Sequence, residues 1–131
     1  MNNKLDIIFA EISAGELIDK ITILEIKLTK ISNNEKLNEI RKELSSLNET
    51  LKKFIPDLNK IKTYIDELKK INLKLWDIED GKRAAEKNKK FDEKFIELAR
   101  NVYKFNDERA KIKLSINNAL GSNIKEVKSY D

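Results

Sequence analysis

Apolar residues recur at spacings of three and four along most of the chain, and this period constrains the fold more than any other feature. Side chains at that spacing share one face of an α-helix, whereas a β-strand places every second residue on one face. The period is interrupted at residues 32–35, at the single proline, Pro56, and at the charged residues 87–90. The sequence therefore predicts an all-α fold of about four helices with coiled-coil-like spacing.

The first predicted helix spans residues 14–31. Ser13 and Glu16 have the spacing of a capping box, in which side-chain oxygens accept hydrogen bonds from otherwise unpaired backbone N–H groups. Ile23 and Ile26 lie on a second apolar face. The main apolar series consists of Leu17, Ile21, Leu24, Leu28 and Ile31. Because a helix that is apolar on two faces has to be covered on two sides, we expect it to lie centrally or at an interface.

The ends of the other helices are marked by turn and capping residues. The second helix follows the turn at residues 32–35 and ends before Pro56. Proline is tolerated in a first helical turn, so Pro56 and Asp57 are predicted to open the third helix. Asp92 is placed to cap the fourth helix, and Gly121 is suited to the left-handed position that ends it.

Four helices with short connections indicate antiparallel neighbours. We expect one domain, residues 1–131, built as an antiparallel bundle of two helical hairpins. The last two helices, of roughly 30 residues each, are longer than the first two, and a homodimer would cover the excess length. The end segments KLDIIFAEI and NIKEVKSY are rich in β-branched residues, so they are candidates for short terminal strands.

The composition excludes several kinds of site. The chain has no cysteine and no histidine, which removes disulfides, thiolate and imidazole chemistry, zinc hydrolases and histidine-based triads. It has no apolar stretch of about 18 residues and no secretory leader pattern, so we expect a soluble, cytoplasmic protein without a membrane partner. The net charge is +4, but acids interrupt every basic run, so nucleic acid is not the expected partner.

One charged residue interrupts the apolar series of the fourth predicted helix. Arg109 stands where the next apolar side chain is due. Asn106 precedes it along the same edge of the helix, and Lys113 and Asn117 follow it. Such a ladder of donors suits a carboxylate or phosphate, although a solvated helix face would look similar. A structural ion pair explains Arg109 equally well, and Glu25, beside the apolar stripe of the first helix, is the candidate partner. The predicted pocket for an anionic small molecule consists of Glu25, Asn106, Arg109, Lys113 and Asn117.

Two acidic pairs suggest a different site. Glu16 and Asp19 share a face of the first helix, and Asp77 and Asp80, in the segment LWDIED, share a face of the third. Two such pairs on neighbouring helices could hold Mg²⁺, the geometry that all-α nucleoside triphosphate pyrophosphohydrolases use. Because 38% of the residues are charged, acids at this spacing are common, so solvent-facing roles are favoured and no cofactor is expected. Trp76, in the same segment, is interpreted as a packing residue.

These patterns favour a small binding or accessory protein with a charged pocket between helices. The alternative is a small enzyme acting on an anionic metabolite such as a nucleotide or sugar phosphate, either with Mg²⁺ or without a metal.

Four segments, SAGELIDKITILEIK, LWDIED, NDERAKIK and KSY, resemble the signature blocks of an uncharacterised family of small bacterial and phage proteins. The resemblance covers nearly the whole chain. It implies no established activity, cofactor or catalytic residue, but it does imply that the four blocks converge in space. It also implies an association with surface-polysaccharide genes, which fits an anionic sugar or nucleotide sugar as the ligand of Arg109 and Lys113.

Overall fold

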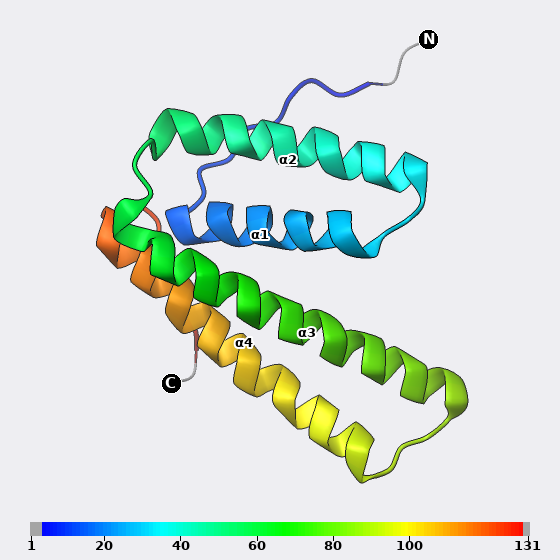
Figure 1. Ribbon diagram of the computed structural model, residues 1–131. Helices are drawn as coiled ribbons and strands as arrows, with labels where there is room; N and C mark the ends of the chain where they lie inside the picture. The colour runs from blue at the N-terminus through cyan, green and yellow to red at the C-terminus, as the bar shows by residue number, and fades with distance from the viewer. Residues whose placement is uncertain (1–3, 130–131) are drawn as a thin grey trace.

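The computed structural model describes residues 4–129, and within them the chain forms two antiparallel helical hairpins. The elements are α1 (Ala14–Lys30), α2 (Asn34–Phe54), a short 3₁₀ turn η1 (Asn59–Ile61), α3 (Lys62–Asn88) and α4 (Glu93–Leu120). One hairpin consists of α1 and α2, and the other of α3 and α4 (Figure 1). The predicted all-α fold of about four helices is confirmed.

The predicted caps form the helix ends. Ser13 Oγ accepts a hydrogen bond of 3.1 Å from the backbone N–H of Glu16 at the start of α1. Asp92 Oδ1 accepts one of 3.2 Å from the N–H of Phe95 at the start of α4. Gly121, with φ 65°, ends α4 in the left-handed conformation that glycine adopts without steric cost.

The start of α3 differs from the prediction. Pro56 and Asp57 lie before the helix, and η1 intervenes before α3 begins at Lys62. Asp57 Oδ1 accepts a 3.0 Å hydrogen bond from the N–H of Asn59, which forms a local turn in place of the first helical turn.

α1 is the central helix. It packs against α2, α3 and α4, whereas α2 packs against α1 alone among the helices. Both faces of α1 are covered, since Leu24 is buried on its main apolar face and Ile26 on its second face. The prediction from its two apolar faces is therefore confirmed. The core cluster, Ile18, Ile61, Leu68 and Ile116, joins α1, η1, α3 and α4.

The hairpin of α3 and α4 extends past the end of the first hairpin, as Figure 1 shows. Phe91 and Ile96, near its turn, are 53% and 54% exposed. The excess length expected from the sequence is thus present and only partly covered within the described chain.

The predicted terminal strands are wrong for the residues that the structure describes. Residues 4–13 and 122–129 contain no strand. Side-chain hydrogen bonds tie the two segments together close to the helices, from Asn123 Nδ2 to Glu11 Oε1 (3.0 Å) and from the Ala14 N–H to Ser122 Oγ (3.1 Å). From this tie the two segments run in different directions (Figure 1), so they do not pair as strands.

None of the helices described between residues 4 and 129 combines the length and apolar character that crossing a bilayer requires.

Candidate functional site

Arg109 pairs with a buried carboxylate on the central helix. Its Nε donates to Asp19 Oδ1 at 3.0 Å, and its Nη2 donates to Asp19 Oδ2. Asp19 is 0% exposed, so the guanidinium supplies charge and two donors that water cannot supply there. These hydrogen bonds raise the pKa of Arg109 above its ordinary value, although burial acts to lower it. A structural ion pair therefore explains the arginine in the apolar series.

The partner of Arg109 differs from the predicted one. Asp19 is four residues before Ile23, and Ile26 is three residues after it, so all three lie on the second apolar face of α1. Glu25 is half-buried on the same helix, but no ion pair or hydrogen bond joins its side chain to the residues between 4 and 129. The prediction of Glu25 as the partner is wrong because Glu25 lies on a different face of α1 from Asp19, six residues away.

Asn72 and Thr22 complete the surroundings of Asp19. Asn72 Nδ2 donates to Asp19 Oδ1 and to Thr22 Oγ1, both at 2.9 Å. Thr22 Oγ1 in turn donates to the backbone carbonyl of Asp19 at 2.8 Å. Both neighbours are buried, which makes this a closed polar network between α1, α3 and α4.

Lys113, one turn further along α4, is surrounded by three carboxylates. Its Nζ lies 2.6 Å from Glu16 Oε2, 3.3 Å from Glu126 Oε2 and 3.8 Å from Asp19 Oδ2. Burial acts to lower the pKa of Lys113, but the hydrogen bond that Lys113 donates to Glu16 and the charges of all three acids outweigh it, so the pKa is raised. The pKa of Glu126 is lowered, first by its hydrogen bond with Lys128 and also by Lys113. Lys113 therefore already has anionic partners within the chain.

Asn117 has a structural role at the start of α1. Its Oδ1 accepts a 2.6 Å hydrogen bond from the N–H of Gly15, and its side chain is buried. A Cβ on Gly15 would lie 2.5 Å from the carbonyl oxygen of Lys113, so this close approach of α1 and α4 requires glycine.

A cleft of about 580 Å³ opens beside the Arg109–Asp19 pair, within the size range of small-molecule sites. Its walls come from α1, α3 and α4. The residues that line it are Ile23, Ile26, Asn72, Leu75, Trp76, Glu79, Asp80, Arg83, Asn106 and Arg109. Among the described residues, the hydrogen bond that Arg109 Nη1 donates is a long one, 3.5 Å, to Asn106 Oδ1. The arginine side chain keeps 28% of its surface exposed. The guanidinium thus joins the buried pair to the cleft.

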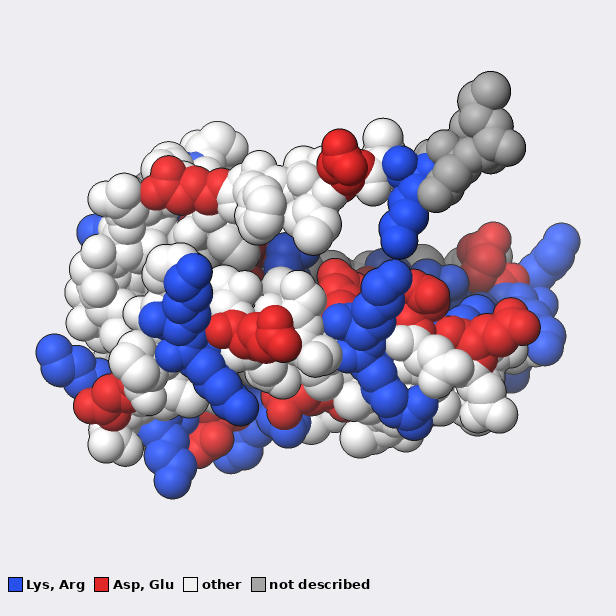
Figure 2. Space-filling model, turned by 90° about the horizontal axis from the view of Figure 1, so that it is seen from above, with Lys and Arg blue, Asp and Glu red and all other residues white. Residues whose placement is uncertain are grey.

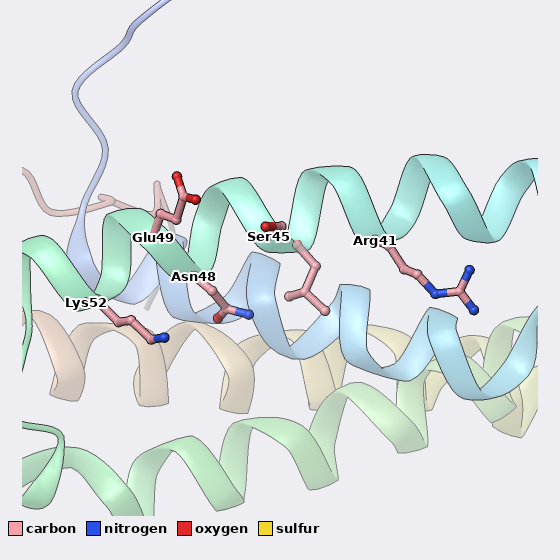
Figure 3. Close-up of a pocket in the computed structure, with 6 residues that line it drawn as sticks. Arg41, Ser45, Asn48, Glu49 and Lys52 are labelled. Atoms are coloured by element: carbon pink, nitrogen blue, oxygen red, sulfur yellow. The ribbon is translucent and has the colours of Figure 1, made fainter.

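A second hollow, of about 440 Å³, lies along α2 (Figure 3). It is lined by residues of that helix alone, namely Arg41, Leu44, Ser45, Asn48, Glu49 and Lys52. No buried polar group lies among them, and no second element supplies a lining residue. We therefore assign the candidate site to the cleft beside Arg109.

The two acidic pairs considered for Mg²⁺ have different surroundings in the structure. Glu16 and Asp19 pair with Lys113 and Arg109, whereas Asp77 and Asp80 are exposed on α3. Within residues 4–129, no three acidic side chains converge in a way that could hold a metal ion.

Of the five residues predicted to form a pocket, the structure brings three together. Asn106 and Arg109 line the cleft, and Lys113 belongs to the adjoining ion-pair network. Asn117 accepts a hydrogen bond from the start of α1 instead, and Glu25 does not line the cleft.

The model of a family of unknown function, DUF6165, matches residues 8–131. The chain belongs to this family. The match confirms the expected membership of a family without an established activity. It spans all four helices, so the buried network and the cleft lie within the part of the chain that matches DUF6165. A search of the curated proteins found no match to the chain, and a search of the solved structures found none.

Sequence reasoning considered Asp19 for Mg²⁺ but did not pair it with Arg109, and it did not place Trp76, Glu79 or Arg83 in the predicted pocket. Asp19 could have been found from its spacing, since positions 19, 23 and 26 share one face of α1. Trp76 was interpreted as a packing residue, but it is half-buried and lines the cleft. Arg83 and Glu79 line it from exposed positions on α3, and the apolar period gives no signal for residues of that kind.

Proposed function

We propose that this protein is a binding protein whose cleft between α1, α3 and α4 takes a phosphorylated sugar. The observation that carries the proposal is the orientation of Arg109. Two of its nitrogens are fixed by a buried carboxylate, the third, Nη1, makes only a long contact with Asn106, and the residue lines a cleft large enough for a small molecule. A guanidinium held in this way binds an anion without losing side-chain freedom at that moment, which favours affinity.

The anionic group of the ligand is assigned to the Arg109 end of the cleft. The charge of Arg109 is balanced by Asp19 behind it, but its Nη1 hydrogens still point away from that carboxylate. The amides of Asn72 and Asn106 add polar groups there, whereas Arg83 stands about 16 Å further along α3 by the helical rise and brings a second guanidinium to the part of the cleft away from Arg109. Planar guanidinium donors match phosphate and carboxylate oxygens well.

The remainder of the cleft favours a hydroxylated ring over a simple anion. Glu79 and Asp80 line the cleft, and carboxylates repel a small anion but accept hydrogen bonds from hydroxyl groups. Trp76 and Leu75 supply an apolar surface against which the face of a sugar ring can pack. A ligand with a phosphate at one end and a sugar ring at the other satisfies both halves of the lining.

Binding without chemistry is the form of the proposal that the residues support best. The chain contains no histidine or cysteine to act as base or nucleophile. The charged groups nearest Arg109 are already paired within the chain. The enzyme alternative predicts release of inorganic phosphate from the bound sugar phosphate, which a colorimetric phosphate assay detects.

Intrinsic fluorescence tests the proposal directly, because the single tryptophan of the chain lines the cleft. We expect glucose 1-phosphate to change the emission of Trp76 along a saturable curve. Glucose alone and inorganic phosphate alone should each bind more weakly, because each engages only one half of the lining.

Two matched arginine variants localise the effect. Arg83→Gln should weaken binding about tenfold, since a hydrogen bond to a charged group contributes about 1.5 kcal/mol. Arg100→Gln replaces an exposed arginine of α4 that does not line the cleft, so the dissociation constant should stay unchanged. If sugar phosphates leave the emission unchanged, or if both variants bind as the wild type does, the proposal is wrong.

A further inference from the structure

The segment that precedes α1 exposes more apolar surface than a monomer ordinarily presents to water. Leu5, Ile7, Ile8 and Phe9 are each at least 79% exposed. Together the four side chains present roughly 600 Å² of apolar surface, comparable with the largest patches found on monomeric proteins. Figure 2 shows the segment, which leads into the grey residues, standing clear of the helical body over part of its length.

The exposed surface of the whole chain is also large for its mass. A folded monomer of 15.3 kDa is expected to expose about 7,100 Å². The structure exposes 10109 Å², which is about 3,000 Å² more. A stable dimer of ordinary size needs about 800 Å² from each partner. Part of this excess belongs to the projecting end of the α3–α4 hairpin (Figure 1) and part to the open end segments, and the apolar side chains before α1 are the part of it that suits an interface.

The segment is neither helix nor strand in the structure, but its β-branched and aromatic residues are those that favour a strand. No backbone hydrogen bond joins residues 5–12 to another part of the described chain. Leu5, Ile7 and Phe9 stand at every second position, so in a β-strand they would share one face, with Asp6 and Ile8 on the other. An extended backbone with unpaired N–H and C=O groups pairs readily with another strand.

We infer that residues 5–9 pair in antiparallel fashion with the same residues of a second copy of this chain. The pattern is self-complementary: in a pair centred on Ile7, Leu5 lies opposite Phe9 of the second copy, and Phe9 lies opposite its Leu5. All three side chains are then on one face, where aliphatic and aromatic residues in opposite positions stabilise a sheet.

The mass of the protein in solution tests this inference. Sedimentation equilibrium of the full chain should give twice 15.3 kDa for the wild type. Ile7→Asp places a charge at the centre of the proposed strand pair and should return the mass to that of one chain. Ile7 is 81% exposed and belongs to no helix, so the circular dichroism of the variant should be unchanged. Phe54→Asp, at a residue 69% exposed at the end of α2, is the matched control and should remain dimeric.

A single introduced cysteine tests the position of the contact. The chain has no cysteine, so Ile7→Cys supplies the only thiol. Paired strands bring the two copies of residue 7 close together, and mild oxidation should yield a covalent dimer in high yield. Phe54→Cys should yield little under the same conditions. A monomeric wild type, or a dimer that persists in Ile7→Asp and does not cross-link through residue 7, would overturn the inference.

Discussion

Replacing Arg109 with methionine should destabilise the protein strongly, because it leaves the buried carboxylate of Asp19 without its main partner. Asp19 is 0% exposed and receives two of its hydrogen bonds from Arg109. Breaking a buried ion pair from one side ordinarily costs about 3–5 kcal/mol. Asn72 would still donate to Asp19, and Lys113 Nζ would remain 3.8 Å away, so we expect the lower end of that range, about 3 kcal/mol.

Chemical denaturation monitored by circular dichroism measures this loss. For a domain of this size, about 3 kcal/mol corresponds to a fall of about 10 °C in Tm. Arg100→Met removes an exposed arginine from the same helix and should change the free energy of unfolding by less than about 0.5 kcal/mol.

A double variant separates the stranded charge from the loss of packing. Asp19→Asn combined with Arg109→Met removes both charges and keeps an oxygen that can accept from Asn72. We expect it to recover about 2 kcal/mol of the loss seen in Arg109→Met alone. A single variant as stable as the wild type, or a double variant less stable than the single one, would refute the reasoning.

Three further predictions concern the same region. Gly15→Ala should lower the free energy of unfolding by about 2 kcal/mol, because the new Cβ meets the carbonyl oxygen of Lys113 at 2.5 Å. Gly81→Ala should be nearly neutral, because the flexible end of Leu98 can move. Equilibrium denaturation of both variants measures the difference. The raised pKa of Lys113 means that its contribution to stability is complete below its ordinary pKa and is lost as the pH rises through the higher folded-state pKa; in denaturation curves at alkaline pH, Lys113→Met should therefore lose less stability than the wild type does. Saturating Mg²⁺ should leave Tm unchanged in thermal melts, since the acids considered as its ligands are paired with cations or dispersed on α3, and a clear rise in Tm would contradict this.

The sequence predicted the helices well because their boundaries depend on local chemistry. The caps at Ser13 and Asp92 and the left-handed end at Gly121 form as their residue types require. The two apolar faces of α1 correctly placed it at the centre of the fold. The terminal strands were not predictable in the same way, because pairing depends on a partner strand that the described chain does not provide.

The site was predictable only in part, because it depends on how helices far apart in sequence face one another. The break in the apolar series at Arg109 correctly indicated a special environment. The choice of partner required the rotation of α1 relative to α4, and the edge position of Glu25 was a weaker guide than the face shared by Asp19 and Ile23. The cleft could not be inferred at all from the period, because its lining combines buried residues with exposed ones such as Arg83.

The central claim, a sugar-phosphate site beside the Arg109–Asp19 pair, is tested most directly by nitrogen-15 NMR of the protein titrated with glucose 1-phosphate. The side-chain signals of Arg109 Nε and of the Trp76 indole report separately on two different lining residues of the cleft. We predict that both shift together along one saturable curve, while the signals of α2 stay in place. Shifts confined to α2, or no shift of either side chain at saturating sugar phosphate, would contradict the account.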